Sequence, residues 1–328
     1  KNEIIAPELL QNIKDLAKMA GVSITTVSRV LNNHPYVSDE KRRAVMEAIE
    51  ATNYQKNINA VHLSRGKTNL IGVVLPFFDH PYFSLVLKGI TNQAEKHNYK
   101  LVLFQTDYRK EREMEALQML KQKLLDALII CSRTSDISTI EEYLPFGPIV
   151  LGEDIRRMGI STTFVNHYNV FQNALEFLYE KGHRKIGYCI GRKSGTNSYM
   201  RQLAYKDFHE KHNLPYHSEY VIDNCLYFED GERVVEHIKK MKVPPTALLV
   251  TSDQVAAGIV ITCKKEVISI PDDIAIIGFN NEPVAKMLNI TTIEIPLFEM
   301  GKNLFLQAIK DEISRKEISV NLIERETV

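Results

Sequence analysis

The spacing of hydrophobic residues divides the chain into two parts. From about Thr68 onward, short apolar runs alternate with amphipathic stretches, as in parallel sheets whose strands are connected by helices. The predicted strands cover residues 70–76, 100–105, 126–132, 148–152, 185–191, 246–252 and 273–279. The predicted helices lie near residues 82–96, 110–123, 137–143, 168–180, 198–212, 230–241 and 253–266. Because these roughly 260 residues exceed what one core usually holds, the pattern predicts an α/β fold of two subdomains.

Before this region, the apolar spacing is that of short helices. The run IKDLAKMAGVSITTVSRVL, residues 13–31, predicts two helices joined by a tight turn. Gly21 can adopt the positive φ that the turn needs, and Ser23 can cap the second helix. The inward stripes are Leu16 and Ala20 in the first helix and Val27 and Leu31 in the second.

A third helix would complete a small core. It is expected from the N-cap residue Ser38 to about Thr52. Its inner side carries Ala44, Val45, Ala48 and Ile49. The outward face of the second helix carries side chains that suit base edges and phosphates, namely Ile24, Thr25, Thr26, Ser28 and Arg29. An ordinary αα-hairpin is the alternative for this stretch taken alone.

Positive charge is concentrated in the same part of the chain. Residues 12–67 contain nine Lys and Arg against five Asp and Glu, a net charge of +4, whereas the whole chain has 41 of each sign. A neutral protein with one basic end is suited to bind a polyanion through that end alone.

The order of the sequence motifs along the chain is specific to one protein family. Residues 13–32 are followed by V-S at Val37, by N-Y at Asn53, by N-x-x-A-x-x-L over residues 57–63 and by I-G-V-x-x-P over residues 71–76. The chain resembles the LacI/GalR family of bacterial transcription regulators over nearly its full length. The resemblance implies three parts: a helix-turn-helix headpiece over residues 1–56, a hinge over residues 57–67, and a periplasmic-binding-protein-like regulatory domain over residues 68–328. Within that domain it implies an N-subdomain of about 68–164 plus 296–321, and a C-subdomain of about 165–293 plus the last few residues.

The resemblance also implies which residues contact DNA. Ile24, Thr25 and Arg29 occupy the base-reading positions, and a bidentate contact from Arg29 to guanine is worth about 1–3 kcal/mol of discrimination. Residues placed for phosphate contacts are Asn12, Ser23, Thr26, Ser28, Asn32, Tyr36 and Tyr54. The hinge positions expected at the DNA are Asn57, Ala60 and Leu63.

In the family, the leucine at the position of Leu63 wedges into a minor-groove step. Two hinge residues depart from the family pattern, because Lys56 replaces a common proline and Asn59 replaces a common apolar residue. A plain flexible tether is the alternative interpretation of this segment.

Ligands of open parallel sheets bind at the carboxyl ends of strands, so the loops there are the candidate effector site. The candidates are Phe77, Asp79, His80, Tyr82, Phe83, Glu153, Arg201, Ser252, Asp253, Phe279 and Asn280. The resemblance assigns ligand contacts to an acid at Glu153, an arginine at Arg201 and an aspartate at Asp253. Asp253 would equally serve as a helix N-cap. Many sugar-responsive relatives carry an aspartate in place of Asn280.

No catalytic constellation emerges, and the chain is predicted not to be an enzyme. There is no G-x-G-x-x-G after a strand and no Walker sequence, and H-E-K-H at residues 209–212 has the wrong spacing for a two-histidine zinc helix. His209 and His212 are therefore expected to be solvated, with no metal and no cofactor. The cysteines are expected to be free thiols, without a C-x-x-C pair: Cys131, Cys189, Cys225 and Cys263. With no signal peptide and no apolar stretch long enough for a bilayer, the expected location is the cytoplasm.

These observations predict a regulator, usually a repressor, that binds a near-palindromic operator as a dimer. A small molecule in the cleft, a sugar or sugar phosphate, would shift its affinity for double-stranded DNA. The chain ends without a heptad tail, which favours a dimer over a tetramer. A sugar-binding protein without DNA function would account for residues 68–328 but not for the first 67. An enzyme would need a base or nucleophile with an activating partner, which the sequence does not supply.

Overall fold

The computed structural model describes residues 13–54 and 66–328, which belong to two compact units, one ending at Thr68 and the other running from Asn69 to Val328. The predictions for Asn12, Lys56, Asn57, Asn59, Ala60 and Leu63 lie outside the described residues.

The first unit contains the three predicted helices, α1 (Ile13–Met19), α2 (Ile24–Leu31) and α3 (Asp39–Thr52). Gly21 has φ of +61°, which confirms the predicted turn. The amide of Thr26 donates to Ser23 Oγ at 3.1 Å, so Ser23 caps α2 as predicted. Ser38 takes the N-cap position of α3 but makes no side-chain cap bond.

The core of these helices differs in detail from the predicted stripes. Leu16, Val27 and Val45 are fully buried, as expected. Ala17 and Val30 are also buried, whereas Ala20 and Leu31 are only partly covered and pack at the edge of the cluster. The two helices therefore face each other through Ala17 and Val30 in addition to Leu16 and Val27, rather than through the predicted Ala20 and Leu31.

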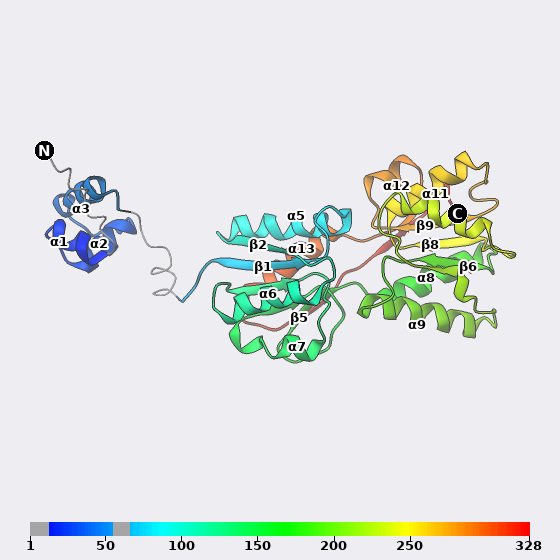
Figure 1. The fold of residues 1–328 in the computed structure, drawn as a ribbon, viewed down its shortest axis with the longest axis horizontal. Coiled ribbons are helices and arrows are strands. Elements are labelled where there is room, and N and C mark those ends of the chain that lie inside the picture. The colour runs from blue at the N-terminus through cyan, green and yellow to red at the C-terminus, as the bar shows by residue number, and fades with distance from the viewer. Residues whose placement is uncertain (1–12, 55–65) are drawn as a thin grey trace, which may run out of the picture. The chain divides into compact units, whose positions relative to one another are not determined.

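In the second unit, two six-stranded sheets each form the centre of a subdomain (Figure 1). The first sheet has the order β11-β5-β4-β3-β1-β2, and all of its strand pairs are parallel. Its strands are β1 (Leu70–Leu75), β2 (Lys100–Gln105), β3 (Ala127–Ile130), β4 (Ile149–Leu151), β5 (Ser161–Phe164) and β11 (Arg315–Glu317). The helices of this subdomain are α5 (Pro81–Lys96), α6 (Lys110–Lys121), α7 (Ile137–Glu141) and α13 (Leu297–Ala308), with the short helix η1 (Leu144–Phe146).

Helix α13 packs against α5 although more than 200 residues separate them in the chain. A Cβ on Gly89 would lie 2.1 Å from the carbonyl oxygen of Phe298, and a Cβ on Gly301 would lie 2.0 Å from that of Val86. The two helices can approach this closely because each carries a glycine at the contact.

The second sheet has the order β12-β10-β9-β8-β6-β7 and is parallel except for β12 against β10. Its strands are β6 (Ile186–Cys189), β7 (Val221–Ile222), β8 (Ala247–Val250), β9 (Ala275–Phe279), β10 (Thr291–Glu294) and β12 (Asn321–Ile323). Its helices are α8 (His167–Glu180), α9 (Thr196–Lys211), α10 (Asp230–Lys239), α11 (Asp253–Lys265) and α12 (Pro283–Met287), with the short helix η2 (Ser218–Tyr220).

The chain passes three times between the subdomains: from β5 to α8, from β10 to α13 and from β11 to β12 (Figure 1). The predicted α/β fold is confirmed, but the strands β5, β7, β10, β11 and β12 were not predicted. The threonines of β5 and β10 are fully buried, and three of the four hydroxyls bond inside the protein, as Thr163 Oγ1 does to Gln307 Oε1 at 2.7 Å. Thr162 Oγ1 has no hydrogen-bond partner within the protein. A threonine-rich strand of this kind lacks the apolar signal on which the sequence interpretation relied.

Candidate functional site

The outward face of α2 presents the predicted base-reading residues to solvent. Ile24 is 44% exposed, and Thr25 and Arg29 are exposed as well. They come from one end and one side of a single short helix, whose other side is held by Val27 and Val30 in the core. Such a helix can enter a major groove without disturbing the three-helix core.

The predicted phosphate-contacting residues of this unit fall into two groups. Tyr36 is 83% exposed, whereas Tyr54 is half-buried and packs on the helical core. Ser23 Oγ lies 2.9 Å from Thr26 Oγ1, and the side chain of Asn32 donates to the carbonyl oxygen of Ser28 at 2.8 Å. Ser23 and Asn32 therefore also stabilise the two ends of α2, a local role that the sequence had suggested only for Ser23.

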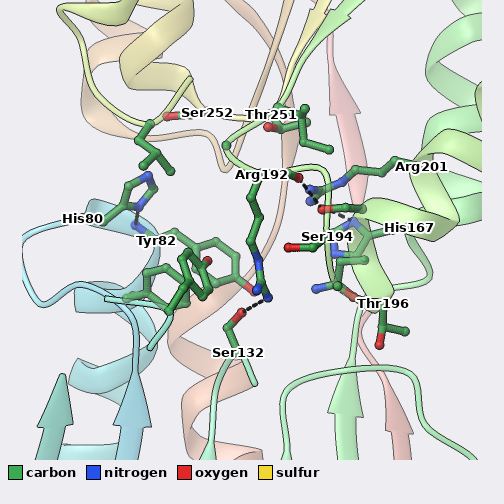
Figure 2. A pocket seen from close by; sticks show the side chains of 18 of the residues that line it. His80, Tyr82, Ser132, His167, Arg192, Ser194, Thr196, Arg201, Thr251 and Ser252 are labelled. Carbon is green, nitrogen blue, oxygen red and sulfur yellow. Dashed lines mark hydrogen bonds between the residues drawn. The ribbon is translucent and has the colours of Figure 1, made fainter. Parts of the chain in front are cut away.

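In the second unit, a cavity of about 110 Å³ lies between the two subdomains. Six of the eleven predicted effector residues line it: His80, Tyr82, Phe83, Glu153, Arg201 and Ser252. The first four come from the carboxyl-terminal side of β1 and β4, and Arg201 and Ser252 come from the other subdomain (Figure 2). Residues at the strand ends of both sheets therefore surround one cavity, as predicted.

Two of the remaining predicted effector residues, Phe77 and Asp79, lie next to this lining without forming part of it. The ring of Phe77 packs edge-on against Tyr108, with centroids 5.4 Å apart, and Tyr108 itself lines the cavity. Asp79 is exposed, and its Oδ1 accepts a hydrogen bond from Tyr227 of the opposite subdomain at 3.2 Å. Phe77 therefore supports the lining, and Asp79 joins the subdomains beside it.

Asp253 was predicted to contact the effector, and the structure places it elsewhere. Its carboxylate is fully buried, where Oδ1 accepts from Thr292 Oγ1 at 2.7 Å and Oδ2 accepts from the amide of Glu282 at 2.8 Å. Burial raises the pKa of Asp253 to about 7. Its side chain fastens α11 to the segments around β10 and α12, because it turns into the subdomain rather than into the cavity.

Phe279 and Asn280 do not line the cavity either. Phe279 is 1% exposed, and its ring packs against Phe171 with centroids 5.8 Å apart. The Asn280 amide donates to Glu282 Oε1 at 3.2 Å, so this side chain also turns into the protein. Asn280 therefore takes no part in the lining.

Most of the polar lining was not predicted from the sequence. The loop after β6 contributes Arg192 and Ser194, the start of α9 contributes Thr196, Asn197 and Ser198, and other segments contribute Tyr108, Ser132, His167 and Thr251. The signal was available for Ser132 and Thr251, because both lie at the carboxyl end of a predicted strand. His167 begins α8 at a crossing between the subdomains, which no local pattern marks.

Arg192 connects the two subdomains across this cavity. Its Nη2 donates to Ser132 Oγ and to the carbonyl oxygen of Arg133, both at 3.1 Å (Figure 2). Its guanidinium also lies over the ring of Tyr108, 3.8 Å from the centroid. In the reverse direction, Arg133 Nη2 donates to Thr196 Oγ1 at 2.9 Å. These contacts hold the subdomains in a closed arrangement.

The electrostatics of the cavity centre on Arg201. Burial lowers the pKa of Arg201 to about 10, which leaves it charged at neutral pH. Its Nη2 lies 3.3 Å from His167 Nδ1. Burial and then the charge of Arg201 hold the pKa of His167 well below its usual range, so the imidazole is neutral and its Nδ1 accepts. Burial likewise lowers the pKa of His80.

Three buried polar atoms in the lining have no hydrogen-bond partner within the protein: Glu153 Oε2, Arg201 Nε and Ser252 Oγ. Glu153 Oε1 is occupied by the amide of Arg133 at 3.0 Å. Arg133 Nε lies 3.1 Å from Glu153 Oε2, but its N–H is not directed at that oxygen. Arg201 Nε and Ser252 Oγ thus lack partners within the protein, and Glu153 Oε2 has only its ion pair with Arg133. Because buried polar groups rarely stay unpaired, these atoms are suited to bind a ligand.

The histidines of the H-E-K-H segment contact other groups of the protein. His209 and His212 were expected to be solvated, and this is wrong. His209 is 3% exposed with Nδ1 2.8 Å from the carbonyl oxygen of Tyr205, and His212 Nε2 lies 2.9 Å from both oxygens of Glu176.

Over residues 13–54 and 66–328, no group of three His, Cys, Asp or Glu could hold a metal ion. In the same ranges, no helix has the length and apolar character needed to span a bilayer.

Comparison with known proteins identifies both units. Residues 12–57 match the family of bacterial regulatory proteins called the lacI family, and residues 68–326 match the family of periplasmic binding proteins and sugar binding domain of the LacI family. The chain is 42% identical over 97% of its length to the whole of an uncharacterized HTH-type transcriptional regulator, YkvZ, of Bacillus subtilis. It is 36% identical, over 97% of its length and 98% of the relative, to the NTD biosynthesis operon regulator NtdR of the same organism.

Two solved structures share the fold. The lac repressor dimer bound to operator and the anti-inducer ONPF superposes with a TM-score of 0.78 at 21% identity, over 96% of this chain and 98% of the repressor. A LacI family regulator from Lactobacillus casei with bound glucose superposes with a TM-score of 0.72 at 24% identity, over 79% of this chain and 99% of that one. Both curated relatives and both structures are regulators rather than enzymes, as the sequence predicts. This chain belongs to the LacI family of bacterial DNA-binding transcriptional regulators.

Proposed function

We propose that this protein is a cytoplasmic repressor that binds a near-palindromic operator as a dimer. Its affinity for the operator depends on a carbohydrate effector. The observation that carries the effector part is the convergence on the cavity between the subdomains of Arg201 Nε and Ser252 Oγ, which are buried without hydrogen-bond partners, and of Glu153 Oε2, which is ion-paired with Arg133. A sugar offers hydroxyl groups that both donate and accept, so a single molecule can satisfy all three.

The DNA part of the proposal assigns direct base contacts to Ile24, Thr25 and Arg29. Their exposure on one face of α2 supports this assignment, as does the net charge of +4 over residues 12–67. A single headpiece offers few contacts, so two copies would be needed for specific binding.

The coupling part of the proposal rests on the contacts that span the cavity. Arg192 and Arg133 each donate to the opposite subdomain, so opening the cavity breaks hydrogen bonds that closing restores. An effector that bonds to Arg201 on one side and to Glu153 on the other favours the closed arrangement. The equilibrium shifts only by the difference in affinity for the two arrangements.

A thermal-shift screen of mono- and disaccharides and their phosphates tests the effector site. We expect at least one compound to raise the melting temperature of the native protein and of Lys206→Gln, an exposed control on the same helix as Arg201. The same compound should leave Arg201→Gln unshifted. An equal shift in Arg201→Gln, or no shift with any carbohydrate, would contradict the proposed site.

A further inference from the structure

Two guanidinium groups in the lining of the cavity carry positive charges that the protein itself does not balance. Arg192 belongs to the loop after β6, and Arg201 belongs to the second turn of α9. Among the residues that the structure describes, neither of them forms an ion pair with an Asp or Glu. The nearby Arg133, in contrast, is paired with Glu153, its Nε lying 3.1 Å from Oε2. Because a charge withdrawn from water is costly unless it is paired, two positive charges remain to be balanced.

The surroundings of Arg201 supply no negative charge. Its Nη2 lies 3.3 Å from Nδ1 of the neutral His167, and its Nε is buried without a hydrogen-bond partner within the protein. The other ionisable groups that act on its guanidinium are the hydroxyls of Tyr82, Tyr108 and Tyr188, which are neutral at pH 7. A bound anion would accept a hydrogen bond from Nε and balance the charge of Arg201 at the same time.

Arg192 lies at the positive end of a helix dipole. Gly195 is the N-cap residue of α9 and has φ of +99°. A Cβ on Gly195 would lie 2.8 Å from Arg192 Nη2, so the guanidinium lies against the start of this helix of 16 residues. No side chain of the N-cap residue accepts from the first N–H groups of α9. Since this end of a helix favours an anion and disfavours a cation, Arg192 increases a positive potential that an anion would relieve.

The two sides of the cavity differ in chemistry. On the side of the second subdomain, the two arginines are accompanied by the hydroxyl groups of Ser194 and Thr196 (Figure 2). The first subdomain contributes the rings of Tyr82 and Phe83 and the ion-paired carboxylate of Glu153. Aromatic rings and a carboxylate suit the apolar face and the hydroxyl groups of a sugar. The cavity as a whole therefore matches a sugar that carries an anionic group at one end.

We propose that the effector is a phosphorylated sugar, whose phosphate binds between Arg192, Arg201 and the first turn of α9. This assignment rests on the carbohydrate site proposed above. A phosphate monoester carries a charge of about −1.5 to −2 at pH 7, which matches two unpaired guanidinium groups, whereas a carboxylate balances only one. Its terminal oxygens accept from Arg201 Nε, from Arg192 and from the N–H groups that begin α9. The sugar ring lies toward Tyr82 and Glu153.

Isothermal titration of the full chain with matched ligands, in a buffer free of phosphate and sulfate, tests this assignment. The ligands are glucose, mannose and fructose, the 1- and 6-phosphates of each, and glucuronate as a sugar with a single negative charge. We expect at least one sugar phosphate to bind at least tenfold more tightly than its parent sugar and than glucuronate, because hydrogen bonds between charged groups are stronger than neutral ones.

Substitution of the arginines should reduce the preference for the phosphate over the parent sugar. We expect this preference to fall below threefold in Arg201→Gln and to fall at least twofold in Arg192→Met. The matched control is Lys206→Gln, which removes an exposed positive charge from the same helix and should keep the preference of the native protein. The ratio of two affinities isolates the phosphate contact, because a general disturbance of the cavity weakens both ligands alike.

Tight binding of neutral sugars alone, or a preference that Arg201→Gln leaves unchanged, would overturn the phosphate subsite and leave the proposed carbohydrate site standing. Equal affinities for glucuronate and the sugar phosphates would show that one negative charge suffices, which also contradicts the assignment. If no sugar and no sugar phosphate binds, both the subsite and the carbohydrate site are wrong.

Discussion

Helix α2 and the cavity between the subdomains present their polar side chains in opposite ways. On α2, Ile24, Thr25 and Arg29 stand in solvent on one short helix. In the cavity, Glu153, Arg201 and Ser252 come from three separate segments and are placed by the packing of two sheets. The first arrangement suits a rigid, extended partner such as DNA, and the second suits a small molecule that the protein encloses.

The difference has an energetic counterpart. Removing an exposed side chain of α2 costs little folding energy, so substitutions there should report on DNA binding alone. The buried groups around the cavity, in contrast, take part in stability, ligand binding and the closed arrangement of the subdomains at once.

The largest effect concerns pH and Asp253. Its pKa rises from 3.8 to about 7 on folding, so the folded state holds a proton that the unfolded state has released between these pH values. The free energy of unfolding should therefore fall as pH rises from about 4 to 7 and level off above, with a contribution from this group of about 4 kcal/mol at most. Urea denaturation at pH 5 and pH 8 measures it.

Asp253→Asn should remove this component of the pH dependence, whatever its absolute stability. Equal slopes for the native protein and Asp253→Asn would show that the carboxylate does not carry it.

Arg201→Gln should weaken binding of the stabilising carbohydrate by about 10- to 150-fold, because a hydrogen bond from a charged group is worth about 1.5–3 kcal/mol. Isothermal titration measures the affinity. DNA binding without effector should match that of the native protein within twofold, since Arg201 lies far along the chain from the headpiece. A parallel loss of both functions would mean that the substitution damages the fold.

Arg29→Ala should reduce the preference for the operator over a scrambled duplex by about 5- to 150-fold, the equivalent of about 1–3 kcal/mol. Fluorescence anisotropy on the two duplexes measures this ratio. Arg43→Ala, on the exposed side of α3, is the matched control for the loss of one positive charge. If both variants lower binding equally on both duplexes, Arg29 contacts phosphates and does not read bases.

Arg192→Met should have the smallest effect, a two- to tenfold weaker carbohydrate affinity, because it removes about 0.5–1.5 kcal/mol of hydrogen bonding to Ser132 and Arg133. Small-angle scattering of the ligand-free protein should show a larger fraction of open molecules. An unchanged affinity and an unchanged scattering profile would show that Arg192 does not hold the subdomains closed.

The sequence predicted the parts of this molecule that depend on local patterns. The helices around Gly21, the cap at Ser23 and the apolar central strands follow from neighbouring residues, and the structure confirms them. The strands β5 and β10 were not predicted, because their buried threonines lack an apolar signal and depend on partners distant in the chain, as Thr163 does on Gln307 and Thr292 on Asp253.

Local sequence patterns likewise predicted only part of the cavity lining. Residues in the loops after predicted strands, such as His80 and Glu153, were placed correctly in the lining. Asp253 stands at an equally suitable position, yet Thr292 and the amide of Glu282 draw its carboxylate into the subdomain. The direction of one side chain at the start of a helix depends on its tertiary partners, which the pattern of residues does not contain.

We propose that a ligand in the cavity controls how tightly the headpiece binds DNA. The decisive experiment measures operator affinity at fixed salt, with and without the carbohydrate found in the screen, for the native protein and for Arg201→Gln. We expect at least a fivefold change in the native protein and none in Arg201→Gln. Equal affinities with and without bound carbohydrate in the native protein would contradict it.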